Sequence, residues 1–277
     1  MRPLLRAAAL AALSGLAVPA LADGDIAPPP PQTTHVDFGL GVGALRFPVY
    51  TGASEMRDVL LPFPYVVVHS QFLDVDRNRV RGKLLKDEDF SVDVDFAGGV
   101  SVNSSDTRER QSMPDLDWLG EAGPALRYHA WRGDDHAGVD LVFPVRVAAS
   151  VHALDFHHRG YTFAPRAEWH LPMELGGDKV TLDSSLTAAF FDKAYSGYYY
   201  SVAPQYATAT RPAYDAPGGY AGWRWEWGLS WHRGEMVYGA FIEHTSLHGA
   251  RFQSSPLVGS GDGTSLGVAV SWVFQHQ

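Results

Sequence analysis

The sequence predicts an all-β fold, a transmembrane antiparallel up-and-down β-barrel formed by one domain over residues 35–277. Apolar and polar residues alternate along segments of about 10 to 14 residues, the length of a tilted membrane-spanning strand. The polar faces of these segments carry many charges, as the lumen of a barrel does. Tryptophans gather near segment ends, where the membrane interfaces would lie: Trp118, Trp131, Trp169, Trp231 and Trp272.

Twelve segments show the alternation, because successive side chains of a strand point to opposite faces. They are 36–47, 59–70, 72–85, 89–102, 117–132, 137–152, 160–174, 179–191, 197–203, 220–233, 236–248 and 264–274. Ten strands are the alternative, if 72–85 is not a strand or 197–203 belongs to a loop. Long connections are expected at 48–58, 103–116, 204–219 and 249–263. A count of twelve places 103–116 at the periplasmic end, where connections are usually short.

Two stretches precede the barrel. Residues 1–22 have the features of a cleavable signal peptide: basic Arg2 and Arg6, an apolar core over 7–18, and the small-residue site Ala20-Leu21-Ala22. The apolar core is too short to span a bilayer, which needs about 20 residues. Residues 23–34 include four consecutive prolines, Pro28 to Pro31, and are expected to form an extended periplasmic tail. The expected location is the cell outer membrane.

Composition excludes several classes of protein. The chain has 277 residues with 22 Lys and Arg against 31 Asp and Glu, a net charge of −9. Removal of residues 1–22, which include two arginines, would lower this to −11. Such an acidic chain offers no basic patch for nucleic acid. The absence of cysteine excludes disulfides, thiolate metal sites, cysteine nucleophiles and a lipid-anchored N-terminal cysteine.

Charged residues at inward positions form the first candidate site. The alternation places these lumen charges inside: Asp93, Asp95, Glu121, Arg127, Asp140, Arg146, Arg166, Glu168, Asp183, Arg224 and Glu226, with Glu243 beside them. One interpretation is a cation-preferring pore lined by excess carboxylate. The other is that carboxylates and guanidiniums pair across a narrow lumen and fill it. Both interpretations remain open from the sequence.

Weaker patterns favour structural explanations. His152, His157 and His158, together with His244 and His248, have no carboxylate at a ligand spacing, so we expect no metal. A rim hydrolase would need Ser246, His244, His157 or Asp155 within hydrogen-bond reach, and there is no G-x-S-x-G motif. The glycines of 39–43 precede Phe47-Pro48 rather than a helix, which argues against a phosphate loop. We expect no catalytic residues and no cofactor.

Several short motifs follow one another along the chain: Leu40-Gly41-Val42-Gly43, Pro48 to Gly52, Leu61 to Tyr65, Gly120 to Arg127, Tyr198 to Val202, Pro212-Ala213-Tyr214, Gly218-Gly219-Tyr220 and Ser255-Pro256-Leu257-Val258. Their order resembles the MipA/OmpV family of outer-membrane proteins over essentially the whole mature chain. The chain departs from the family pattern in two places. Ser201 stands where glycine is expected, and three residues follow Phe274, where the barrel-assembly signal usually ends.

The resemblance implies a non-enzymatic outer-membrane barrel. It also implies a scaffold role that brings a lytic transglycosylase together with a murein synthase, with outer-membrane lipid and the barrel-assembly machinery as further partners. Other members are described as adhesins or as porin-like proteins, and these are the alternative functions. Candidate contact residues are Tyr198, Tyr199, Tyr200, Pro212, Tyr214, Gly218, Gly219, Ser255 and Pro256, and the candidate assembly signal is Trp272 and Phe274. The tyrosine run fits either a recognition surface or an aromatic girdle.

Overall fold

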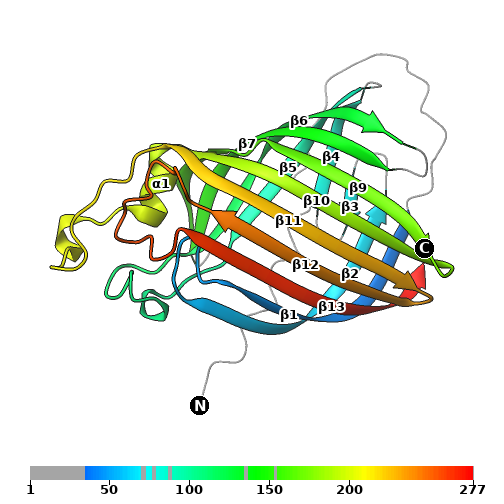
Figure 1. The fold of residues 1–277 in the computed structure, drawn as a ribbon, viewed down its shortest axis with the longest axis horizontal. Coiled ribbons are helices and arrows are strands. Elements are labelled where there is room, and N and C mark those ends of the chain that lie inside the picture. The colour runs from blue at the N-terminus through cyan, green and yellow to red at the C-terminus, as the bar shows by residue number, and fades with distance from the viewer. Residues whose placement is uncertain are drawn as a thin grey trace. The chain divides into compact units, whose positions relative to one another are not determined.

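The computed structural model describes residues 35–69, 73–76, 79–86, 89–133, 137–152 and 155–276. The expected signal peptide and tail lie outside these residues. Thirteen described strands form one antiparallel sheet (Figure 1). They are β1 (His35–Pro48), β2 (Met56–His69), β3 (Leu73–Asp76), β4 (Arg79–Lys86), β5 (Phe90–Gly99), β6 (Trp118–Arg132), β7 (Gly138–His152), β8 (Asp155–Phe163), β9 (Arg166–Leu175), β10 (Asp178–Phe191), β11 (Gly219–Arg233), β12 (Met236–Ser246) and β13 (Asp262–His276).

The sheet closes on itself because β13 pairs with β1 as well as with β12. Apart from β8 and β9, which do not pair with each other, the strands pair with their neighbours along the chain in the predicted up-and-down order. Strands β8 and β9 lie end to end between β7 and β10, so the described strands occupy twelve positions around the barrel. The break between them falls at Ala164-Pro165, where proline has no backbone N–H to donate to the ladder.

Strand β7 shows why the sequence forms a membrane barrel. Its outward residues Phe143, Val145 and Val147 are 40–50% exposed, whereas inward Arg146 is 7% and Ala148 is 0% exposed. Apolar side chains therefore face outward and charged ones inward, the reverse of a water-soluble core. In a bilayer only a closed sheet satisfies all its backbone hydrogen bonds between strands. The predicted fold class, a transmembrane antiparallel β-barrel, is confirmed.

Three predicted strands are wrong in detail: 160–174 is divided between β8 and β9 within one strand position, and two others change the strand count. The segment 72–85 is two short strands, β3 and β4, rather than one long one. The segment 197–203 overlaps a helix, α1 (Lys193–Tyr200), which Asp192 caps by accepting a hydrogen bond from the Tyr195 N–H at 2.8 Å. The predicted twelve matches the twelve positions only because these two errors cancel.

The barrel has two different ends. Tight turns at Gly176-Gly177 and Gly234, all with positive φ, lie at the same end as the start of β1 and the end of β13. We name this the turn end. The connections 49–55, 100–117, 192–218 and 247–261 lie at the opposite end, named the loop end (Figure 1). The prediction that 103–116 lies at the opposite end from the other long connections is wrong, because it contacts two of them through Arg108–Glu55 and Arg110–Tyr199.

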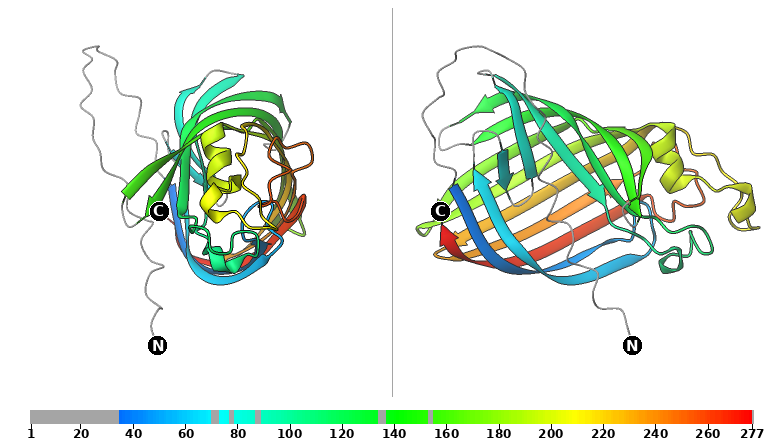
Figure 2. Two further views of the ribbon diagram at one scale, coloured as in Figure 1. Left: turned by 90° about the vertical axis from the view of Figure 1, so that its left-hand side faces the viewer. Right: turned by 180° about the vertical axis from the view of Figure 1, so that it is seen from behind.

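The loops pack together into a core of their own, named the loop plug. Its buried residues include Tyr50, Val102, Leu116, Tyr200, Leu247 and Phe252. Tyr200 and Phe252 stack with ring centroids 3.9 Å apart, a pair that adds about 0.5–1.5 kcal/mol beyond burial. Figure 2 shows α1 and the loops across the mouth of the barrel. Among the described residues, no helix is long and apolar enough to cross a membrane.

Candidate functional site

An ion-pair network runs along the inner wall over four consecutive strands, β5, β6, β7 and β9. Arg127 on β6 contacts Asp93 at 3.1 Å and both Asp140 and Glu168 at 2.7 Å. The Arg127 side chain is 5% exposed, so the carboxylates rather than water stabilise its charge. Three hydrogen-bonded carboxylates compensate the cost of burying the guanidinium.

Two further arginines extend the network. Arg146 on β7 contacts Asp95 at 2.6 Å and Glu121 at 3.0 Å. Arg166 on β9 contacts both Asp95 and Glu168 at 2.7 Å. The network therefore contains three guanidiniums and five carboxylates. These eight lumen charges therefore form carboxylate–guanidinium pairs, but between neighbouring strands of one wall rather than across the lumen.

The remaining lumen charges lie on the neighbouring strands. Asp183 on β10 lies within hydrogen-bond distance of His170 on β9, with 2.6 Å between Oδ1 and Nδ1. Arg224 on β11 lies 3.5 Å from Glu243 on β12. Glu226 stands directly opposite Glu243 in the β11–β12 register.

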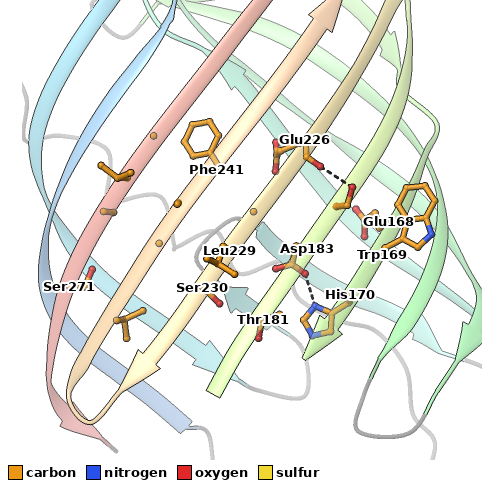
Figure 3. A pocket seen from close by; sticks show the side chains of 18 of the residues that line it. Glu168, Trp169, His170, Thr181, Asp183, Glu226, Leu229, Ser230, Phe241 and Ser271 are labelled. Carbon is orange, nitrogen blue, oxygen red and sulfur yellow. Dashed lines mark hydrogen bonds and ion pairs between the residues drawn. The ribbon is translucent and has the colours of Figure 1, made fainter. Parts of the chain in front are cut away.

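A cavity of about 1040 Å³ occupies the lumen between this network and the turn end. Its volume lies at the upper limit for small-molecule pockets. One wall comes from β1, β2, β12 and β13 and includes Leu45, Phe63 and Phe241. The facing wall is polar and includes the labelled side chains Glu168, His170, Asp183 and Glu226 (Figure 3).

The sequence reasoning missed parts of this site. Phe63 and Phe241 were not considered, although both occupy inward positions of their strands. The pair His129–Asp140, 2.8 Å apart, was also missed, and its signal was an inward histidine on β6 beside the predicted lumen charges. No group of three or more metal-ligating side chains forms a metal site among the described residues.

The tyrosine run lies in α1 and packs against the loop plug. Tyr200 is 2% exposed, whereas Tyr198 and Tyr199 are partly buried. Burial raises the pKa of Tyr200 and of Tyr199 above their ordinary value of 10. Arg110 holds the same region by donating from Nη1 to the Tyr199 carbonyl at 2.9 Å, and burial lowers the pKa of its guanidinium.

The other candidate contact residues also belong to the loop end. Ser255 is buried and donates to the Tyr200 carbonyl at 2.6 Å, and Pro256 follows it. Tyr214 pairs with Val202 through the backbone, and Pro212 is exposed nearby. Gly218 and Gly219 lead into β11: a Cβ on Gly218 would lie 2.7 Å from the Lys193 nitrogen, and Gly219 has a φ of +128°.

The remaining candidates are distributed over distant strands. Trp272 and Phe274 of β13 face outward, at 52% and 49% exposure. Of the hydrolase candidates, Asp155 and His157 lie on β8, whereas His244 and Ser246 lie on β12. These two strands are not neighbours in the sheet, so the structure does not bring the four residues together.

A closed antiparallel barrel with an apolar outer belt and an ion-paired lumen defines an outer-membrane β-barrel protein. The chain belongs to the MltA-interacting protein MipA family, which it matches over residues 40–274. That match covers nearly the whole barrel and agrees with the family resemblance of the sequence motifs. No curated protein matches the chain.

Several solved structures are similar in a limited way. A FadL homologue from Pseudomonas aeruginosa is 6% identical, with 87% of this chain and 90% of that chain covered and a TM-score of 0.28. OpdO from the same organism is 8% identical, with 87% and 97% covered and a TM-score of 0.23. A second structure, of OccK3 (OpdO), also from Pseudomonas aeruginosa, is 10% identical, with 87% of this chain and 95% of that chain covered and a TM-score of 0.20. These TM-scores are too low to support any conclusion about this chain.

Proposed function

We propose that this chain is a non-enzymatic outer-membrane partner of the enzymes that cut and build peptidoglycan, a lytic transglycosylase and a murein synthase. Membership of the MltA-interacting protein MipA family carries this proposal. The barrel holds the chain in the membrane, with outer-membrane lipid against its apolar belt and Trp272 and Phe274 in its barrel-assembly signal. The partners bind outside the lumen.

The turn end is the proposed contact side. Outer-membrane barrels keep short turns in the periplasm and long loops outside, and peptidoglycan lies in the periplasm. Export through a cleaved signal peptide at 1–22 would leave the tail 23–34 as a spacer on that same side. Exposed charges near the turns, including Glu174, Lys179 and Arg233, provide polar contact points.

The alternative functions have less support. A cation-preferring channel would be lined by excess carboxylate, whereas Arg127, Arg146 and Arg166 pair with carboxylates along the wall from β5 to β9. An adhesin needs an exposed recognition surface at the loop end, and Tyr200 and Ser255 of the candidate surface are buried there.

Photo-crosslinking in cells tests the scaffold proposal. A photoreactive residue at Glu174, Lys179 or Arg233 should capture a lytic transglycosylase or a murein synthase. The matched controls carry the same residue at exposed loop-end positions, Ala213 and Gln253, and should capture neither enzyme. Capture of these enzymes only from the loop end, or from no position, would contradict the proposal.

A further inference from the structure

The hydrogen bonding between strands leaves two edges unpaired in one part of the barrel wall. β2 pairs with β1 along its whole length, Met56 to His69, but on its other edge it pairs with β3 only at Val68 and His69. β5 pairs with β6 along its whole length, but with β4 only from Ser91 to Val94. Within the described part of the chain, the facing edges of β2 and β5 are therefore unpaired towards the loop end.

The hairpin of β3 and β4 is too short to fill the space between these two strands (Figure 1). Its last pair of described residues is Asp76 with Arg79. Beyond it, residues 56–67 of β2 and 95–99 of β5 have no described strand beside them on the facing sides. We name these two stretches the open edges.

Two prolines adapt the edge of β2 to remain unpaired. Successive residues of an antiparallel strand direct their N–H and C=O groups to alternate sides. The β1–β2 ladder passes through Pro62 and Pro64 without a register shift, so neither nitrogen occupies a position that must donate to β1. Both nitrogens therefore point to the open edge, where an N–H group would lack a partner in lipid. Because proline cannot donate to an added strand either, this edge is a poor one for pairing with another chain.

The open edges lie between apolar surfaces. Leu60 of β2 points outward with 76% exposure, and Phe96 of β5 points outward with 50% exposure, so the apolar belt continues on both sides. The inward positions of β2 carry Val59, Leu61 and Phe63, none of them charged. Leu61 and Phe63 also line the lumen cavity. An apolar inner surface thus connects the open edge of β2 with the cavity.

The β5 side of the open edges is uncovered. Ala97 stands opposite Glu121, so its side chain faces inward, and it is exposed. Ala125, at an inward position of the neighbouring strand β6, is only 2% exposed. At the loop end the open edges are bridged, because Arg57 donates from Nη1 to the Ser101 carbonyl at 3.1 Å.

We propose that the open edges border a lateral opening, through which an apolar molecule passes between the hydrocarbon of the outer membrane and the lumen. The surfaces on the two sides select the class of molecule, since lipid lies outside and the apolar inner face of β2 lies inside. A charged solute would have to leave water to take this route, at a high cost in free energy. The lateral opening is independent of the proposed scaffold role, which uses the outside of the turn end.

Cysteine labelling of the full barrel in phosphatidylcholine vesicles tests the proposal, because the chain has no cysteine of its own. The reporter is Ser230→Cys, since Ser230 lines the cavity from β11, four strands away from β2. One reagent is N-(1-pyrenyl)maleimide, which dissolves in the bilayer. The other is a sulfonated maleimide, which reaches the cavity from water. We expect both reagents to label the reporter.

A second substitution shows which route the apolar reagent takes. Ala97→Trp places a large side chain at the β5 side of the lateral opening. It should slow labelling by the pyrenyl reagent about tenfold, because the reagent must then cross water to reach the cavity. Labelling by the sulfonated reagent should not change. Ala240→Trp is the matched control, because Ala240 is exposed on the outer face of β12, and it should change neither rate.

Three results would overturn the lateral opening: no labelling of the reporter by the pyrenyl reagent, an unchanged rate in Ala97→Trp, or equal slowing of both reagents. The alternative occupant of the open edges is a strand of another protein. Protection of Ala97→Cys from the pyrenyl reagent in native outer membranes, but not in vesicles of the purified barrel, would identify that occupant and contradict the proposal. Resistance of each unheated variant to unfolding in dodecyl sulfate confirms that it has folded.

Discussion

Tyr195 of α1 donates a hydrogen bond of 2.7 Å to Glu121 on β6, and this contact joins the loop plug to the ion-pair network. Glu121 also accepts from Arg146 at 3.0 Å and from the Thr162 hydroxyl at 2.7 Å. One buried carboxylate thus holds a loop helix, two strands and the network together. The position of α1 is therefore coupled to the charges inside the barrel.

Removing this hydroxyl should loosen the loop end. Tyr195→Phe should lower the free energy of unfolding by about 1.5–3 kcal/mol, the value of a hydrogen bond to a charged group. The midpoint of urea unfolding, followed by tryptophan fluorescence, measures the change. Tyr214→Phe is the control, since its hydroxyl contacts Ser254 at 3.1 Å on the exposed surface. Equal shifts in both variants would contradict the coupling.

Substitution of Arg127 should lower the free energy of unfolding more than substitution of any other lumen charge. Arg127→Met leaves Asp93, Asp140 and Glu168 without their shared cation, and we expect a loss of about 3–5 kcal/mol. Lys193→Met serves as the comparison, because its 2.7 Å pair with Asp215 is about 70% exposed on both sides. The loss expected from an exposed pair of this kind is about 0–1 kcal/mol. A stable Arg127→Met barrel would show that the network does not contribute to stability.

Alkaline pH should destabilise the loop plug. Burial raises the pKa of Tyr50, Tyr199 and Tyr200 above 10, so these phenols stay protonated in the folded chain while they ionise in the unfolded chain. The stability that these buried phenols contribute is fully present below pH 10. The free energy of unfolding falls as the pH rises above 10. The urea midpoint should therefore be lower at pH 11 than at pH 8. Tyr200→Phe should show a smaller pH dependence; an unchanged dependence would contradict this origin.

The depth of an outward-facing residue in the membrane should determine how much its replacement by arginine lowers the free energy of unfolding. Val268 faces outward near the middle of β13 with 58% exposure, and Val268→Arg should cost about 2–4 kcal/mol. Leu175 is also outward, but it ends β9 at the turn end. Leu175→Arg should cost about 0–1 kcal/mol, because its guanidinium reaches the interface. Equal costs, measured by unfolding in lipid vesicles, would argue against this membrane position.

The sequence predicted the strands well wherever alternation was strict. In β7 both the span and the inward positions of Asp140 and Arg146 follow from a period of two. It failed at 197–203, because aromatic residues favour strands, whereas α1 depends on the Asp192 cap and on burial beneath other loops. It failed again at 160–174, where Pro165 divides one strand position into β8 and β9.

The partners of the lumen charges lay beyond prediction for a physical reason. Which face a charge occupies is a local property of its strand, and the alternation gives it directly. The contacts of Arg127 with Asp140 and Glu168 depend instead on the register of β6, β7 and β9 against one another. The cavity has the same origin, since its lining combines residues from several strands.

The pairing of β1 with β13 also limits how the protein can be assembled. Pairs such as Arg46 with Leu266 join opposite ends of the barrel sequence. Before the 15 residues of β13 arrive, β1 and β12 are both open edges whose unpaired N–H and C=O groups cannot enter lipid without a cost of several kcal/mol each. Insertion therefore cannot proceed one strand at a time as the chain emerges. Loss of the last strand would leave an open sheet, whose unpaired edges can pair with other chains, rather than a smaller barrel.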